Sequence, residues 1–345
     1  MADNFRDDSC SDIDFVIPWV DGSDPEWQKQ KAQYSTDGKS EVLDGDEARY
    51  RDWGILPYWF RAVEKYAPWV RRIHFITCGQ IPKWLNLNHP KLHFVRHEDY
   101  IPHKWLPTFS SHPIELNMHR IEGLSEKLVY FNDDVFLNAP VKPEDFFVDG
   151  LPCDTAGLAS AFICDSGISH IRVSNLEVIS KNFDFRKQFR ANFTKWISFK
   201  YGLKILARTA LLFPVCYWGA SLGMCSLHTA HSFLKSTFTE VWDKAGKECE
   251  STSSHRFRDN ADVNQYLMEW WQIMSGKFHP RSRNFSARYQ FKRPGLEADD
   301  ILRHKHKVIC LNDNEFISHA EFEEAARSVR DAYHQVLPEK SSFEL

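Results

Sequence analysis

The sequence lacks the patterns that indicate several common classes of protein. Its eight cysteines form no CxxC pair and follow no regular spacing, which argues against a zinc ribbon or a disulfide framework. No apolar run approaches the roughly 18 residues that span a bilayer, and the polar, acidic residues 1–11 do not resemble a signal peptide. No internal repeat or low-complexity tract is present. We therefore expect reduced, buried thiols and a cytoplasmic protein.

The chain also has little net charge. Its formal charge of −4 argues against a protein that binds nucleic acid over its whole surface. Its 345 residues suffice for one large α/β domain or two smaller ones. Aromatic residues are frequent, with 26 Phe, 12 Trp and 11 Tyr, and they suit sugar or base stacking as well as core packing.

Short apolar segments alternate with helical ones along the chain. β-branched and aromatic residues predict strands at residues 13–20, 73–78, 92–95, 128–131 and 308–311. Apolar periodicity predicts helices over 49–66 and around 114–123, and a capping box at Ser318 and Glu321 opens the last helix. The alternation predicts an α/β fold with a mostly parallel, Rossmann-like sheet flanked by helices.

An acidic motif directly follows the strand predicted at residues 128–131. Asn132, Asp133 and Asp134 would lie at the carboxyl end of this strand, where open α/β sheets place ligand sites. Two adjacent carboxylates raise each other's pKa, so they favour a cation or a proton beside them. A divalent ion bridging nucleotide phosphates would meet that need, whereas the alternative is a solvated turn.

The segment from Lys181 to Arg208 is strongly basic. It contains eight Lys or Arg residues against one acid, Asp184, and aromatic residues are interspersed among them. Such a segment suits a membrane surface or an anionic polymer. The alternative is a solvated helix face over an aromatic core.

Four blocks of the sequence, in order, resemble the Stealth family of sugar-1-phosphate transferases. The family includes bacterial capsule-polymer phosphotransferases and the animal lysosomal-enzyme GlcNAc-1-phosphotransferase. The blocks cover most of residues 13–313, and their main landmarks are Ile13–Pro25, Arg49–Asp52 through Asp134, His228–His231 with Thr252–Asp262, and Cys310–Asp313. One departure is Ala230, where many bacterial members carry a proline.

The resemblance implies transfer of a sugar-1-phosphate from a nucleotide-sugar to a hydroxyl, with release of a nucleoside monophosphate. Glu115, Asp134, His228 and Arg258 fall on the family's catalytic positions. His228 would accept the hydroxyl proton or hold a phosphate oxygen, and Arg258 would bind the phosphoryl group. Asp134 would be a metal ligand or the base. On a helix, Glu115 would share a face with His119, and the family position favours Glu115.

The remaining site residues follow predicted strands or lie in the matching blocks. We expect the nucleotide-sugar to bind near the following residues: Trp19, Asp21, Gly22, Asp24, Arg49, Arg51 and Asp52. We expect Mg²⁺ or Mn²⁺ to be bound by Asp133, Asp134, Asn312 and Asp313. The basic segment would hold the growing capsule or cell-wall polymer or contact the inner face of the plasma membrane.

The blocks on either side of the basic segment must meet to form one site. We therefore predict one catalytic domain over residues 12–317, with residues 175–215 as an inserted basic, aromatic, helical lobe and residues 318–345 as a C-terminal helix and tail. Two other functions stay open. A metal-dependent glycosyltransferase would release a nucleoside diphosphate, and a non-catalytic protein would only bind polyanions or sugars.

Overall fold

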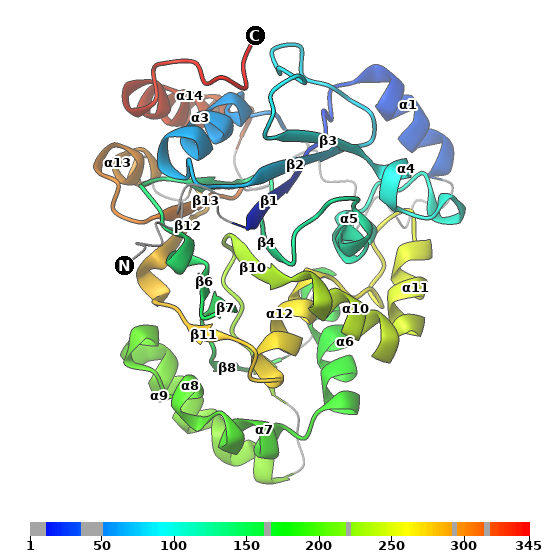
Figure 1. Cartoon of the computed structure of the whole chain (residues 1–345), viewed down its shortest axis with the longest axis vertical. Helices are drawn as coiled ribbons and strands as arrows, with labels where there is room; N and C mark the ends of the chain where they lie inside the picture. Colours follow the sequence, from blue (N-terminus) through cyan, green and yellow to red (C-terminus); the bar gives the residue numbers. More distant parts are fainter. Residues whose placement is uncertain (1–11, 36–50, 162–166, 219–221, 292–294, 314–317) are drawn as a thin grey trace, which may run out of the picture.

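The computed structural model describes residues 12–35, 51–161, 167–218, 222–291, 295–313 and 318–345 (Figure 1). Arg49, one of the predicted donor-binding residues, lies outside them.

A five-stranded sheet forms the centre of the molecule. Its strand order is β10 (His231–Leu234), β4 (Lys127–Tyr130), β1 (Ile13–Pro18), β2 (Arg72–Thr77) and β3 (Leu92–Arg96). The last four strands are parallel, and β10 pairs antiparallel with β4. The predicted α/β fold with a mostly parallel sheet is confirmed, and the four parallel strands lie within two residues of the predicted bounds.

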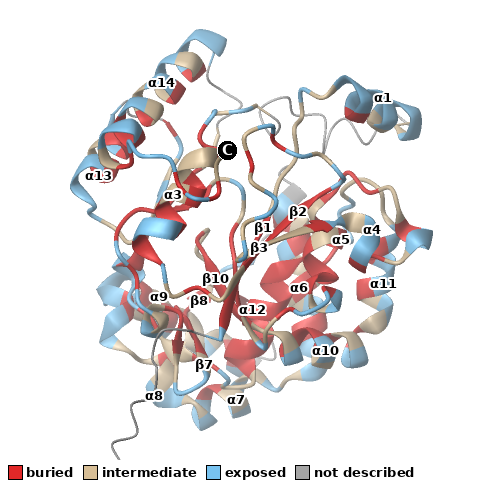
Figure 2. Ribbon diagram, turned by 45° about the horizontal axis from the view of Figure 1, so that its top comes forward, coloured by how far each residue is buried: buried red, intermediate tan, exposed pale blue. Residues whose placement is uncertain are grey.

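The sheet separates two hydrophobic cores because successive strand residues point to opposite faces. Phe15 and Val129 belong to the core that contains residues of helices α3 and α14, whereas Val16 and Leu128 belong to the core with α10 and α12. Figure 2 shows the buried strands between helices whose outer faces are exposed. Burial on both faces explains why the strands are mostly apolar, and the buried exceptions Asp14 and His74 bond to each other.

Smaller sheets complete the strand structure. One has the order β12 (Ser286–Tyr289), β13 (Val308–Leu311) and β5 (Val135–Leu137), and another has β11 (His279–Pro280), β7 (Leu151–Asp154) and β6 (Phe147–Val148). β8 (Leu158–Ala159) pairs with β9 (Gly223–Met224). The strand predicted at 308–311 is therefore present, but it lies outside the central sheet. Because it pairs with β5, it brings the end of the fourth sequence block beside the acidic motif.

Helices surround the sheets (Figure 1). Their bounds are α1 Pro25–Tyr34, α3 Leu56–Tyr66, α4 His97–Tyr100, α5 Ser111–Leu116, α6 Gly167–Asn182, α7 Phe185–Ala191, α8 Phe193–Trp196, α9 Gly202–Leu212, α10 Lys235–Lys244, α11 Gly246–Ser254, α12 Gln265–Met274, α13 Leu296–Arg303 and α14 His319–Val336. Short 3₁₀ turns cover His103–Trp105, Met118–Arg120, Pro143–Asp145, Phe199–Tyr201, Phe213–Trp218 and Arg283–Phe285. The capping box predicted at Ser318 is confirmed.

Two predicted helices are wrong in their extent. The helix expected from residue 49 begins at Leu56 and carries Pro57 in its first turn, a position that proline favours. The helix expected over 114–123 ends at Leu116, so Glu115 and His119 do not share a helix face. His119 instead lies in a 3₁₀ turn and stacks on Phe238, at 6.0 Å between ring centroids.

The basic segment is broken into short helices. It begins at the end of α6 and continues through α7, α8, a 3₁₀ turn and α9, which together form one end of the molecule (Figure 1). Aromatic side chains such as Phe189 and Trp196 pack inward, while Lys187, Lys200 and Lys204 are exposed. We call residues 185–212 the basic lobe. The division of the chain into a catalytic domain, a lobe and a tail stays a prediction.

Candidate active site

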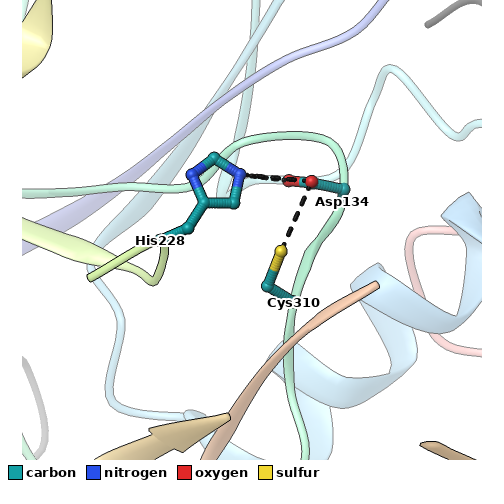
Figure 3. A group of neighbouring side chains, drawn as sticks. All are labelled: Asp134, His228 and Cys310. Carbon is teal, nitrogen blue, oxygen red and sulfur yellow. Dashed lines mark hydrogen bonds and ion pairs between the residues drawn. The ribbon is translucent and has the colours of Figure 1, made fainter. Parts of the chain in front are cut away.

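Asp134 lies in the loop between β4 and β5 and is held by the strand beside it. Its backbone carbonyl accepts a hydrogen bond from the Leu311 amide at 2.8 Å. Its carboxylate accepts from the Cys310 thiol at 3.4 Å (Figure 3). It also accepts from the Asn312 side-chain amide at 3.3 Å. The pairing of β5 with β13 therefore fixes the position of this carboxylate.

His228 faces Asp134 from the segment before β10. Its Nε2 lies 3.2 Å from both Asp134 carboxylate oxygens, and its Nδ1 lies 3.1 Å from the Tyr266 hydroxyl. Burial would lower the pKa of His228, but the Asp134 carboxylate outweighs burial and raises it above its usual value. Conversely, burial would raise the pKa of Asp134, but His228 and the Cys310 and Asn312 hydrogen bonds lower it.

Asp133 has a different environment from its neighbour. Crowding by protein atoms and the negative charge of Asp134 raise the pKa of Asp133 to about 7, while the charges of His228 and Arg258 act in the opposite direction. Its side chain is nevertheless in contact with solvent, which moderates the shift. Asp133 is thus an exposed carboxyl that gains from a nearby cation.

Glu115 supports the acidic loop through hydrogen bonds. It is buried, and its two oxygens accept hydrogen bonds from the Tyr130 hydroxyl and the Gln265 amide, both at 3.3 Å. The Gln265 side chain in turn donates to Asn132 at 3.2 Å. The residue after Gln265 is Tyr266, whose hydroxyl contacts His228, so the glutamate holds the same helix start that contacts the histidine.

Arg258 belongs to a loop that is fixed by a buried carboxylate. Asp262 accepts from His112 and from His255, each at 2.7 Å, and also from the Asp259 amide at 3.1 Å. Arg258 donates to the Ser111 hydroxyl at 3.2 Å. Its charge acts to lower the pKa of Asp133, against the crowding by protein atoms and the Asp134 charge that raise it. The structure thus places Asp134 and His228 in direct contact, with Glu115 and Arg258 in the segments around them.

The loop after β1 is ordered by Gln80, which follows β2. The Gln80 side chain donates to the Asp21 carbonyl at 3.0 Å and to the Asp24 carboxylate at 2.9 Å. Asp24 caps α1, and the Asp21 carboxylate accepts from the Ser23 amide at 2.9 Å. Because β1, β2 and β4 are parallel, this loop and Asp134 lie at the same edge of the sheet.

The other predicted donor-binding residues make mainly internal contacts. Trp19 stacks on Phe75 with 5.9 Å between ring centroids, and the Gly22 carbonyl accepts from Gln28 at 2.8 Å. The Asp52 carboxylate accepts from the Gly54 amide at 2.7 Å.

Arg51 forms a two-pronged ion pair with Asp313. The two hydrogen bonds measure 2.9 and 3.0 Å, and the guanidinium lies 4.5 Å from the centre of the Phe322 ring. Both Asp313 oxygens are therefore engaged by an arginine. Asn312, by contrast, contacts Asp134 directly and also accepts from Arg288.

Sequence reasoning missed two residues that shape this site. Tyr266 contacts His228 from the first turn of α12, and Cys310 contacts Asp134 although its apolar neighbours indicated only a buried thiol. Tyr266 follows Asp262 by four residues, directly after the block that carries Arg258. Proximity to that block was the available signal for Tyr266. Cys310 begins the fourth block, two residues before Asn312, and that position was its available signal, although the contact itself depends on the pairing of β13 with β5.

The comparison with solved structures gives only distant matches. The galactosyltransferase LgtC in complex with donor and acceptor sugar analogs aligns with 95% of this chain and 98% of its own, at 9% identity and a TM-score of 0.36. A structure of an active-site mutant of LgtC aligns at 11% identity and a TM-score of 0.37, covering 91% of this chain and 95% of its own.

Protein sequences give much closer matches. The chain is 42% identical to the capsular polysaccharide phosphotransferase WcwK of Streptococcus pneumoniae over 333 residues, covering 96% of this chain and 98% of the relative. It is 39% identical to the receptor polysaccharide phosphotransferase WefC of Streptococcus gordonii, covering 96% and 99%. It is also 39% identical to the exopolysaccharide phosphotransferase cps2G of Lactiplantibacillus plantarum, covering 96% of each chain.

Four family regions match in the order expected from the sequence blocks. Stealth protein conserved region 1 matches residues 11–39, region 2 matches 49–153, region 3 matches 227–269 and region 4 matches 299–345. Together with the close relatives, these matches show that the chain belongs to the Stealth family.

Proposed function

We propose that this protein transfers a sugar-1-phosphate from a nucleotide-sugar to a hydroxyl of a glycan acceptor in capsule, exopolysaccharide or cell-wall polymer synthesis. The observation that carries the proposal is the contact between His228 and Asp134, which lie 94 residues apart in the sequence. The names of the relatives, which match over nearly the whole chain, support the same reaction.

In this reaction the acceptor oxygen forms a bond to the phosphorus that carries the sugar. The phosphoanhydride bond breaks, its bridging oxygen leaves with the nucleoside monophosphate, and the product is a phosphodiester. The acceptor hydroxyl loses a proton. Catalysis of this kind depends on aligning the groups and stabilising charge on the phosphoryl oxygens.

We assign the proton acceptance to His228. At 3.2 Å, Nε2–H donates to the ionised Asp134 carboxylate, so the lone pair of the neutral ring lies on Nδ1, beside the Tyr266 hydroxyl, and this nitrogen receives the acceptor proton. Asp134 then stabilises the imidazolium that forms. Glu115 holds the loop of Asn132 through Gln265, and Arg258 supplies a rigid pair of donors for a phosphoryl oxygen.

The residues around Asp134 fit a hard divalent cation. Asp133 is an exposed carboxyl whose pKa is raised, and it adjoins the Asp134 carboxylate. We propose that Asp133 and Asp134 bind Mg²⁺ or Mn²⁺, and that Asp313 instead orders Arg51 near the site. Asn312 would join them through its side-chain oxygen, which accepts from Arg288 in the structure while its amide nitrogen donates to Asp134. When bound, the ion would neutralise charge on the donor phosphates.

We propose that the nucleotide-sugar lies along the edge formed by the loop after β1. Trp19 is partly exposed there, and Gly22 offers close backbone approach between Asp21 and Asp24. Arg51 and Asp52 are assigned to the same subsite, together with Arg49.

Nucleotide release is the direct test. The protein is incubated with UDP-GlcNAc or other nucleotide-sugars, a glycan acceptor and Mg²⁺ or Mn²⁺. The expected result is acceptor-dependent nucleoside monophosphate, which is lost in Asp134→Asn and His228→Ala and retained in His103→Ala, an exposed histidine outside the site. Diphosphate release would identify a glycosyltransferase instead. Absence of turnover with a broad set of donors and acceptors would favour a binding protein.

We also propose that the basic lobe contacts an anionic membrane surface. Large apolar side chains point outward at multiples of four residues: Phe199 is 88% exposed, Leu203 is 80% exposed and Leu211 is 78% exposed. Lys200 and Lys204 are exposed among them. Apolar side chains beside lysines suit a lipid interface with anionic headgroups, because the aliphatic leucines gain more from lipid chains than from a polar glycan. Among the described residues, no helix is long and apolar enough to cross a membrane.

Vesicle sedimentation tests this contact. The protein is expected to sediment with phosphatidylglycerol vesicles and to remain in solution with phosphatidylcholine vesicles. Leu203→Ser with Leu211→Ser should reduce binding at least about tenfold, because each leucine contributes more than about 1 kcal/mol when buried. Leu87→Ser, an exposed leucine outside the lobe, is the control. Equal binding by the double variant, or binding only to a soluble polyanion, would contradict the proposal.

A further inference from the structure

A second group of histidine and carboxylate side chains lies beside the active site. Asp154 at the end of β7, His231 at the start of β10 and Glu269 in α12 each offer a ligand atom, and these atoms all lie within 4.8 Å of one another. The three side chains are at most 5% exposed. We call them the buried triad.

The triad has polar atoms without partners. Neither ring nitrogen of His231 has a hydrogen bond, and the Oε2 atom of Glu269 has none. A buried polar group without a partner costs about 1–3 kcal/mol, so an empty triad would be unfavourable. Each of the three side chains offers one ligand atom within 4.8 Å of the other two, which is the arrangement that a bound cation would satisfy.

Arg281 lies beside the triad and also has an unpartnered atom. Its backbone amide donates to the Asp154 carbonyl at 2.7 Å, and its Nη2 donates to the Ala230 carbonyl at 3.3 Å. Its Nη1 has no hydrogen bond. Burial raises the pKa of Asp154 and, together with the charge of Asp154, that of Glu269, so a metal bound here would displace protons.

The geometry points to a binding site for a transition-metal dication, Zn²⁺ foremost, formed by Asp154, His231 and Glu269. One imidazole nitrogen and two carboxylates suit Zn²⁺, Mn²⁺ or Co²⁺ better than Mg²⁺. A water that completes the coordination would also accept a hydrogen bond from Arg281 Nη1. The metal would connect three elements that are distant in sequence: β7, β10 and α12.

The buried triad is linked to the active site through Tyr266. The His231 ring lies 5.5 Å from the Tyr266 ring at an angle of 82°, and the Tyr266 hydroxyl contacts His228. The metal would therefore fix the histidine against which Tyr266 packs. This consequence for turnover rests on the proposed function, whereas metal binding itself does not.

Metal content is the first measurement. Protein without a histidine tag is loaded separately with Zn²⁺, Mn²⁺ and Co²⁺ in the presence of excess Mg²⁺, dialysed and analysed for metal. About one equivalent is expected in the wild type and in Asp134→Asn, and less than about 0.1 in Glu269→Gln and His231→Asn. Glu297→Gln, a buried glutamate outside the triad, is the matched control and should retain the metal.

The Co²⁺ form provides a test that needs no variant. Its visible absorption spectrum should show bands of a nitrogen- and oxygen-ligated ion, and Zn²⁺ should displace them. Loading should also raise the melting temperature of the wild type, because the ion binds only the folded chain. Wild-type protein that retains no metal, or triad variants that retain as much as the wild type, would overturn the proposal. Neither result bears on nucleotide release.

Discussion

Two groups of histidine and carboxylate side chains lie on either side of Tyr266, and they satisfy their polar atoms differently. Asp134 and His228 are each about one-fifth exposed, and they bond to each other, to Tyr266, to Cys310 and to Asn312. The buried triad is closed to solvent and has unpartnered atoms. The same residue types therefore suit proton transfer at the open group and structural metal binding at the closed one.

The largest expected effect is on turnover at the open group. Asp134→Asn removes the charge that stabilises protonated His228, so nucleotide release should fall by about 10²–10⁴-fold. Its free energy of unfolding should change by less than about 1 kcal/mol, because the amide keeps the shape of the side chain. Enzyme kinetics and urea unfolding measure the two quantities. A small loss of turnover would remove Asp134 from the catalytic group.

A substitution in the buried triad should instead affect mainly the free energy of unfolding. His231→Ala leaves a cavity between Phe233 and Tyr266, and we expect the free energy of unfolding to fall by about 2–4 kcal/mol. His228→Ala, at the partly exposed position, should change it by no more than about 1 kcal/mol. Urea unfolding of the two alanine variants compares them directly. Similar losses of unfolding free energy in the two variants would contradict the distinction between a closed group and a partly exposed one.

The pH dependence of turnover should report His228. Its pKa is raised above the usual 6.5 by Asp134, and the neutral imidazole that can accept a proton exists only above that pKa. The value of kcat/KM should therefore rise about tenfold per pH unit below the histidine pKa and level off above it. NMR titration should give a lower His228 pKa in Asp134→Asn. A profile that is flat between about pH 5 and 8 would assign proton acceptance to another group.

The smallest effect concerns the ion pair at the edge of the site. Arg51 and Asp313 are partly buried and form two hydrogen bonds, so a double-mutant cycle with Arg51→Met and Asp313→Asn should give a coupling of about 1 kcal/mol. The Mg²⁺ concentration for half-maximal turnover should stay the same in Asp313→Asn. An increase of about tenfold or more would instead make Asp313 a metal ligand.

The positions of the catalytic groups could be predicted only in part from the sequence. The apolar segment before Asn132 predicted a strand with carboxylates at its end, and this local pattern was sufficient because a buried strand needs continuous apolar residues. The helix around Glu115 was predicted too long. Residues 111–123 are compatible with a longer helix, but the chain turns at Asn117, whose side chain bonds Pro113 and Ser253.

The sequence by itself determined the parallel strands, the acidic motif, the capping box at Ser318 and the residue types that the family reaction requires. These features depend on neighbouring residues and on the alternation of apolar side chains. Only the tertiary structure decided that Tyr266 and Cys310 contact His228 and Asp134, that Arg51 engages Asp313, and that the buried triad forms. Each of these contacts joins segments separated by 38 or more residues, and no local pattern encodes which distant side chains a folded chain brings together.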